Sequence, residues 1–420
     1  MKSIIKLLTL ILAFAMTLSL VACNGEDDQS STANCTGWAF EYDVKTREVE
    51  EGDNTVKEKY VLITGIFVAD GTATALANGT LTELETLVIG ENGKITVPVY
   101  VSENSDEVVY ENNALKTTEL TLGVGAAEGC KHFEIADDAF ANQLIVKEAI
   151  VHSSVKVIGS ASFAGCANLE KITLPHIGSE KDSVNAKKAF ANIFGSAEAA
   201  NCTSTSVNYN ESGTATYFVP NALKEVVINY AEEKETVDNV ETVKSVAIPA
   251  YAFNGLTTIE KITVTGNVTK VGKNAFENCS GALEINLPAT VTEIGQKAFN
   301  GCSSLMVFDL SNFSALTTVY QQAFAGCTSL GYGKKTVNLP ASLTYLGEKA
   351  FYGCTGITSI NLANLEEISA YCFYGCSSLA TVTSNKKASE VTLGEYAFEK
   401  CAEGIKYNYA KEAEDTQTQA

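Results

Sequence analysis

A chain of 420 residues that is 45% hydrophobic can bury a large core, but it is long for one compact globule. Its formal net charge of −20 argues against the nucleic-acid-binding class, because those proteins need a basic footprint on the phosphate backbone. We therefore expect no nucleic-acid partner and a surface that faces water. A fold built from units that each need only their neighbours would escape the size limit.

The first residues have the pattern of an export signal. Lys2 and Lys6 precede a short apolar run, Leu7–Leu20, which ends at small residues. The run of about 14 residues is shorter than the roughly 20 needed to span a bilayer. Leu20-Val-Ala-Cys23 resembles the bacterial lipoprotein box, which implies a lipoprotein signal peptide over residues 1–22 and lipid attachment at Cys23. We expect an exported protein held at the bacterial cell envelope by that lipid; an ordinary cleavable signal is the alternative.

The next segments differ from the rest of the chain. Residues 23–35 are mostly polar and predict a flexible tether. Between residues 36 and 119, β-branched runs such as Tyr60–Ile63 and Ile95–Val101 are broken by Gly and Asn-Gly turns. We predict a β-rich N-terminal cap, or a set of degenerate opening coils, that covers the first edge of the segment after residue 119. A separate binding domain is the alternative.

A repeat occupies most of the remaining sequence. Its most regular feature is a small residue followed by phenylalanine, and most of these pairs lie between 22 and 27 residues apart. Such a period is typical of a solenoid with one short strand per coil. The repeated phenylalanines are Phe140, Phe163, Phe190, Phe253, Phe276, Phe299, Phe324, Phe351, Phe373 and Phe398.

Each repeat opens with the pattern Leu-x-x-Ile-x-Leu, as in Leu169–Leu174, and alternation places its apolar side chains inward. We predict a β-solenoid over residues 120–409, with one parallel-sheet strand per coil of ~23 residues. The polar residues 194–222 predict a long projecting loop, and residues 410–420 predict a disordered tail.

The repeated residues have a structural interpretation. We expect each phenylalanine to stack on the next inside a shared core. A glycine follows the second apolar pair of the repeat, as Gly295 follows Val291 and Ile294. Pro249 fills this position in another repeat, and proline cannot adopt positive φ, so we expect an exposed bend without positive φ.

Cysteine recurs three residues after the phenylalanine in seven repeats, for example at Cys302. Because Leu256 fills the same position elsewhere, we favour buried free thiols. Disulfides between neighbouring coils and a metal site are the alternatives.

The middle residue of each strand should point outward and form a column along the sheet. These residues are small and polar in most coils, which makes them a candidate ligand-facing array, although a merely solvated sheet face is the simpler interpretation. The column comprises Thr173, Thr263, Asn286, Asp309, Asn338, Asn361 and Thr383.

Signs of catalysis are scarce. The three histidines, His132, His152 and His176, fall in different repeats without matching partners. We found no nucleophile elbow, phosphate loop or dinucleotide-binding turn, and the carboxylates are scattered. We therefore predict neither an enzyme nor a bound cofactor.

Together, the strand pattern, the Ala-Phe pair and the following cysteine resemble the bacterial BspA-like leucine-rich-repeat surface proteins over about Leu120–Cys401. The resemblance implies a curved, right-handed leucine-rich-repeat β-solenoid displayed at a cell surface. It also implies adhesion to host or neighbouring cells, with an extracellular protein as partner. A structural spacer or decoy antigen without a ligand is one alternative. A glycan-binding lipoprotein, with Trp38, Tyr217 and Tyr320 as stacking residues, is another.

Overall fold

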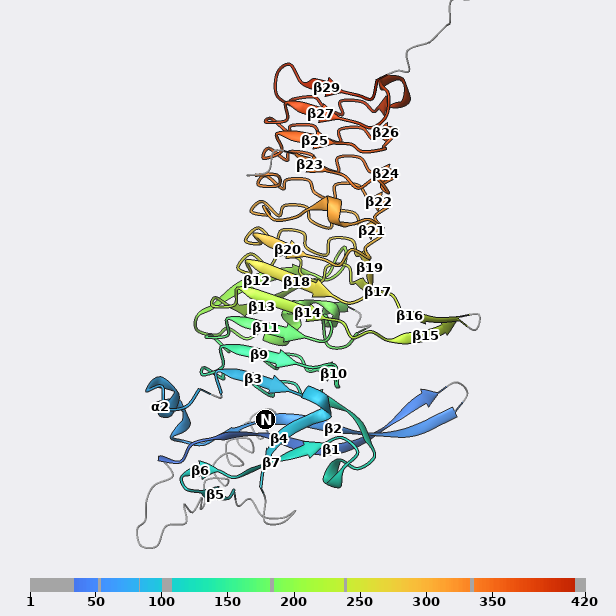
Figure 1. Ribbon diagram of the computed structural model, residues 1–420. Helices are drawn as coiled ribbons and strands as arrows, with labels where there is room; N and C mark the ends of the chain where they lie inside the picture. Colours follow the sequence, from blue (N-terminus) through green and yellow to red (C-terminus); the bar gives the residue numbers. More distant parts are fainter. Residues whose placement is uncertain are drawn as a thin grey trace, which may run out of the picture.

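The computed structural model describes residues 34–51, 54–82, 84–99, 108–181, 185–237, 240–332 and 336–411. Successive coils lie on one another in chain order, and a β-rich region lies at the N-terminal end of the stack (Figure 1). The predicted solenoid is confirmed. Its apolar side chains form one continuous core that runs from Phe40 to Ala397.

One side of the stack is a parallel main sheet. The strands are short because each coil has only one inward-facing Ile-x-Leu pattern, as in Ile172 and Leu174, which are fully buried. The sheet consists of two ladders with one coil between them. The first ladder is linked to that coil by the bridge Glu284↔Val307. The first ladder contains β3 (Thr86–Ile89), β9 (Glu148–Val151), β11 (Lys171–Leu174), β14 (Glu225–Asn229), β18 (Lys261–Thr265) and β20 (Glu284–Asn286). The second contains β23 (Val337–Asn338), β25 (Ser359–Asn361), β27 (Thr381–Thr383) and β29 (Lys406–Asn408).

A second side of each coil carries another short strand. The apolar residue of this strand points inward, as Ile294 and Val319 do, and the strands pair in parallel. Along the stack they are β8 (Cys130–Ile135), β10 (Val155–Ile158), β17 (Val246–Ile248), β19 (Val268–Val271), β21 (Glu293–Ile294), β22 (Thr318–Val319), β24 (Tyr345–Leu346), β26 (Glu367–Ile368) and β28 (Thr392–Leu393).

The third side holds the repeated phenylalanines. The rings from Phe253 to Phe398 stack almost parallel: the Phe276 and Phe299 centroids lie 5.1 Å apart at 5°, and Phe299 and Phe324 lie 5.0 Å apart at 2°. Phe140 and Phe163 are tilted by 41°. The backbone is paired there too, because the Phe276 N–H donates to the Ala298 carbonyl at 2.7 Å. Nine of these rings are fully buried and Phe398, in the last coil, is half-buried. The predicted core ladder is confirmed from Phe253 to Phe398. Earlier in the stack, the Phe163 N–H pairs with Ile193, next to Phe194, and not with Ala189, next to Phe190.

Left-handed backbone occurs on both sides of each phenylalanine in the regular coils. Two residues before Phe299, Lys297 has a φ of 54°, and two residues after it Gly301 has a φ of 75°. The same pair of positions is left-handed around Phe276, at Asn274 and Asn278. This geometry lets the chain turn sharply while the ring stays inside.

The glycine that follows the second strand has a different role from the one expected. The prediction that this glycine does not need positive φ is confirmed at Gly295 and Gly272. The prediction of an exposed bend was wrong, because both glycines are half-buried. A Cβ on Gly295 would lie 2.6 Å from the Val271 carbonyl oxygen of the preceding coil. Close approach of two backbones therefore favours glycine there.

The repeated cysteines are free thiols. Each thiol donates to the carbonyl of the phenylalanine one coil earlier, as Cys302 does to Phe276 at 3.1 Å. Burial raises the pKa of the Cys166 thiol, to about 12, and of the less buried Cys401 thiol, to about 11. The free-thiol interpretation is confirmed for this column.

The N-terminal region is joined to the solenoid by backbone pairing. A long hairpin of β1 (Trp38–Glu51) and β2 (Asn54–Val68) pairs through β2 in parallel with β8, and β3 extends the main sheet. β3 therefore behaves as the strand of an opening coil, which was one of the two forms predicted for this region. Cys35, expected in the tether, is fully buried. The other elements here are α2 (Thr72–Ala77), η2 (Glu91–Gly93), η3 (Gly125–Ala127) and the hairpins β4 (Lys94–Pro98)–β7 (Thr117–Thr121) and β5 (Tyr110–Glu111)–β6 (Ala114–Leu115).

The segment expected as a long polar loop over residues 194–222 is a hairpin of β12 (Cys202–Asn208) and β13 (Thr214–Pro220). The loop prediction was wrong because the segment has its own apolar alternation, which buries Val207, Tyr217 and Val219 in the core. The coil before it carries η4 (Asn185–Lys188) and η5 (Phe190–Phe194). Within η5, the Ile193 carbonyl accepts a hydrogen bond from the Phe163 N–H.

Two further features lie at the surface. Another hairpin, β15 (Lys234–Val237)–β16 (Val240–Val243), projects from the stack on the same side as the tip of β1–β2 (Figure 1). Near the end of the chain, the Ala410 N–H donates to the Lys386 carbonyl at 2.9 Å; most of the predicted tail lies outside the described residues. The remaining elements are η6 (Leu310–Asn312) and η7 (Ala388–Glu390).

Candidate functional site

The outward column predicted from the sequence exists as a set of paired residues on the main sheet. Thr263 pairs with Asn286 in one ladder. In the other, Asn361 pairs with both Asn338 and Thr383. Thr173 is separated from Thr263 by Val227, which pairs with both. The Thr and Asn side chains of this column are half-buried, except for Asn338, which is exposed. The structure thus aligns six of the seven predicted residues on strands, and their role in binding stays a prediction.

Asp309 is the exception. It does not lie on a strand but caps η6, where its carboxylate accepts hydrogen bonds from the Ser311 N–H at 3.1 Å and the Ser311 hydroxyl at 2.7 Å. Local hydrogen bonding to the following backbone competes with strand pairing for Asp. The strand prediction was therefore wrong at this coil.

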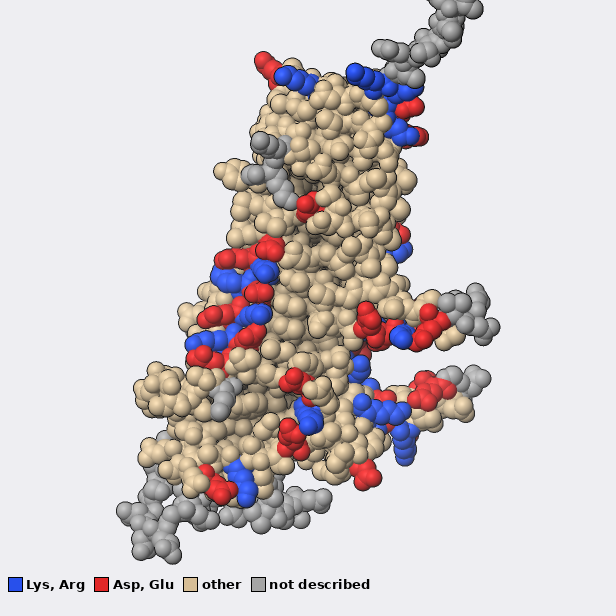
Figure 2. All heavy atoms as spheres, viewed as in Figure 1, with Lys and Arg blue, Asp and Glu red and all other residues tan. Residues whose placement is uncertain are grey.

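A charged stripe runs beside the column where the strands begin (Figure 2). Acidic and basic residues alternate there from coil to coil, so neighbours pair: Lys147 lies 2.7 Å from Glu85, and Lys171 lies 3.1 Å from Glu148. An open hollow of about 640 Å³ lies over these coils. The stripe was not recognised from the sequence, although the repeat spacing contains it. We define it as Glu85, Lys147, Glu148, Glu170, Lys171, Lys224, Glu225, Glu260, Lys261 and Glu284.

The face changes character toward the C-terminal coils, where the same view shows few charged residues (Figure 2). There the column contains Asn361 and Thr383, and the strands that carry them begin at Ser359 and Thr381. Such a surface offers hydrogen-bond donors and acceptors without strong charge. A partner lying along the column would therefore meet both a charged and an uncharged part.

A tyrosine patch on the phenylalanine side was also missed. Tyr352 and Tyr374 stack at 5.2 Å, and Tyr371 and Tyr396 lie 5.1 Å apart. Cations cover some ring faces: Lys349 lies over Tyr371 at 5.0 Å, and Lys400 lies over Tyr374 at 5.1 Å. Tyr352 and Tyr396 are the more exposed members, at 40% and 46%, so the patch offers aromatic surface to a partner.

The three aromatic residues predicted to stack on a glycan do not form one group. Tyr217 is 5% exposed in β13 and lies in the core, and Trp38 packs edge-on against Phe40 at 5.1 Å. Tyr320 is 42% exposed and lies edge-on to Tyr345. Tyr217 is thus unavailable as a stacking residue, because its alternation in β13 directs it inward.

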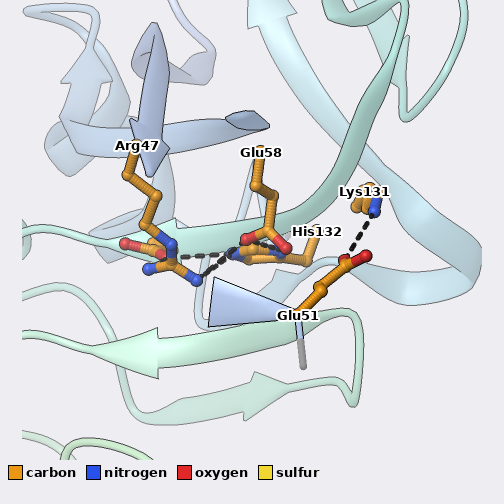
Figure 3. A network of polar contacts seen from close by, with 6 residues as sticks. Arg47, Glu51, Glu58, Lys131 and His132 are labelled. Carbon is orange, nitrogen blue, oxygen red and sulfur yellow. Dashed lines mark hydrogen bonds and ion pairs between the residues drawn. The ribbon is translucent and has the colours of Figure 1, made fainter. Parts of the chain in front are cut away.

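His132 is not without partners. Its Nε2 lies 2.9 Å from Glu134, which also pairs with Arg47 at 2.5 Å, and its ring stacks on Tyr60 at 5.6 Å. Arg47 also pairs with Glu58 at 2.9 Å (Figure 3). These side chains come from β1, β2 and β8, so the network joins the N-terminal hairpin to the first coil. Each carboxylate has a cationic or imidazole partner, which fits a structural role.

The part of the chain that the structure describes lacks two features that would suggest other functions. It contains no group of three or more His, Cys, Asp or Glu side chains that could hold a metal ion. Within that same part of the chain, no helix has the length and apolar character that a membrane crossing requires.

Comparison with solved structures returned several leucine-rich-repeat proteins. One from T. pallidum is 25% identical, with a TM-score of 0.32, and the match covers 47% of this chain and 85% of that chain. One from Bacteroides ovatus is 19% identical, with a TM-score of 0.35, over 87% and 77% of the two chains. A leucine-rich cell surface protein from Faecalibacterium prausnitzii is 15% identical, with a TM-score of 0.33, over 89% and 76%.

No curated protein matches the chain. The family model described as the BspA type leucine rich repeat region matches residues 133–234, 237–333 and 331–420, in six copies. This match covers well over half of the chain and coincides with the stacked coils. The chain therefore belongs to the family of BspA-type leucine-rich-repeat proteins.

Proposed function

We propose that this chain is a surface-displayed binding protein that holds an extracellular protein partner along the outer face of its main sheet. Proteins of its family are typically found at the cell surface or secreted, and their repeats generally serve protein–protein interaction rather than catalysis. The observation that carries the proposal is the register of the column, in which Thr263 and Asn286, and Asn361 and Thr383, lie directly beside each other. Rigid arrays of this kind are what solenoids commonly use for binding.

The proposal includes a membrane anchor. Cys23 lies outside the described residues, and its lipid would tether the folded region to the bilayer. Mass spectrometry of the protein purified from its membrane tests this directly. A diacylglyceryl mass on the peptide beginning at Cys23 is the expected result. An unmodified N-terminus at another residue would contradict the anchor without affecting the binding proposal.

The partner is proposed to bind the outer face of the main sheet, because the small polar side chains of the column let the surface of a partner approach the sheet closely. Thr263→Arg with Asn286→Arg would place two bulky cations in the column. Thr318→Arg with Gln321→Arg is the matched control, since it adds the same charge to half-buried positions near β22 on another side. Removal of residues 194–222 is unsuitable as a test, because it would remove the buried Val207 and Val219.

The measurement is retention of host extracellular proteins on the immobilised folded chain, followed by the affinity of the retained protein for each variant. We expect the column variant to lose at least tenfold in affinity and the control to stay within about twofold. Equal losses in both variants, or no retained protein, would contradict the proposal. Loss only on Tyr352→Ala with Tyr396→Ala would move the binding surface to the tyrosine patch.

A further inference from the structure

His176 follows β11 and has an unusual environment. Its side chain is 4% exposed, and neither ring nitrogen makes a hydrogen bond of good geometry. Burial lowers the pKa of His176 to about 4, and hydrogen bonding of the ring to the main chain of Gly178 and Lys156 opposes this shift. The imidazole is therefore neutral at physiological pH, and it offers one N–H donor to its surroundings. A buried polar group whose hydrogen bonds are poorly formed is costly, so a group of matching chemistry is expected beside it.

The ring lines a cavity at the base of the β15–β16 hairpin. The cavity has a volume of about 50 Å³, and its wall includes Ser153, Pro175 and Tyr230. A water molecule needs roughly 10–15 Å³ of such space, so the cavity has room for a few waters or one compact group. A second hollow of about 120 Å³ shares Ser153 with it and reaches Thr173 of the column.

Cations surround this cavity in a protein that is otherwise strongly acidic. Lys156 and Lys181 both line it, and their charges also lower the pKa of His176. Lys181 lies 2.7 Å from Glu233, whose pKa is lowered chiefly by that hydrogen bond and further by Lys244 and Lys156. Two ammonium groups and an imidazole thus face one carboxylate, and the local charge is positive.

We propose that the His176 cavity is a binding site for a compact anion, either chloride or a single carboxylate group. The imidazole N–H donates to the anion, and Lys156 and Lys181 supply the opposite charge. The neighbouring hollow gives space for the remainder of a small carboxylic acid. This site is independent of the proposed sheet-face partner.

The chain offers a clean spectroscopic test because it contains only three histidines. The mature protein is labelled at histidine, and the ring signals are followed by NMR while chloride or acetate is added. Benzenesulfonate, whose ring does not fit a cavity of about 50 Å³, keeps the ionic strength constant. We expect one signal, absent in His176→Gln, to shift in a saturable way with chloride or acetate and its pKa to rise, because a bound anion favours imidazolium.

Substitutions separate binding from a general salt effect. Lys156→Gln removes an exposed cavity cation and should weaken anion binding about fivefold. Lys244→Gln is the matched control, because Lys244 lies 3.8 Å from Glu233 but does not line the cavity. Saturation by chloride alone would identify an ion site, and saturation by acetate a carboxylate site. No saturable shift, or an equal loss in both lysine variants, would mean that only water occupies the cavity and would overturn the proposal.

Discussion

The Cys302 thiol donates a hydrogen bond to the main-chain carbonyl of Phe276 at 3.1 Å, linking its coil to the one before it. The contact recurs between Cys327 and Phe299 and between Cys354 and Phe324. A thiol at this position therefore packs as a small hydrophobe and also donates a weak hydrogen bond. This pairing explains why cysteine recurs although leucine can fill the same space.

Stability should fall in alkaline solution. Burial raises the pKa of Cys166 and Cys376 from 9.0 to about 12, so these thiols stay protonated in the folded chain while the unfolded chain ionises. Their stabilisation is complete below pH 9 and is lost as the pH rises toward 12. Each such cysteine should steepen the loss by about 1.4 kcal/mol per pH unit in this range. Urea unfolding between about pH 8 and 10.5 measures the slope, and Cys376→Leu should reduce it; an unchanged slope would contradict the assignment.

The phenylalanine ladder should be most sensitive in its middle. Phe299 stacks between Phe276 and Phe324 and is fully buried, whereas Phe398 is half-buried in the last coil. Phe299→Ala should lower the free energy of unfolding by about 3–5 kcal/mol, and Phe398→Ala by about 1–2 kcal/mol. Chemical denaturation followed by far-ultraviolet circular dichroism compares the two. Equal costs would show that the coils do not share one core.

Left-handed positions occupied by ordinary residues should accept glycine. Lys297 has a φ of 54°, a conformation that costs an L-residue roughly 1 kcal/mol. We expect Lys297→Gly to raise the free energy of unfolding by about 0.5–1 kcal/mol. Lys270→Gly, in the extended backbone of β19, should lower it by a similar amount. The same denaturation assay decides, and a loss at both positions would contradict the left-handed geometry.

The β12–β13 hairpin should behave as part of the core. Val219 is fully buried, while Thr216 on the same strand is exposed. Val219→Asp should destabilise the protein by about 3–5 kcal/mol, because it buries an unpaired charge, and Thr216→Asp should change stability by less than about 0.5 kcal/mol. Limited proteolysis between residues 202 and 220 gives a second readout. Equal resistance of the two variants would place the hairpin outside the core.

Much of the fold follows from the repeat itself. Because one period makes one coil, every phenylalanine from Phe253 to Phe398 had to meet its equivalent, and the outward column followed from alternation on each strand. The signal weakens wherever the chain departs from the period. Thr86–Ile89 joins the main sheet without the repeat's phenylalanine, so no spacing placed it there.

The sequence alone determined the stacking, the inward rings, the cysteine column and the family. Tertiary structure alone decided where the insertions and caps lie: Tyr217 is buried because its hairpin folds back on the coils, and Asp309 leaves the sheet to cap η6. It also brought His176 beside Lys156 and Lys181 around one cavity. The physical reason is that a period encodes contacts between equivalent positions, whereas these contacts join unlike positions from different coils.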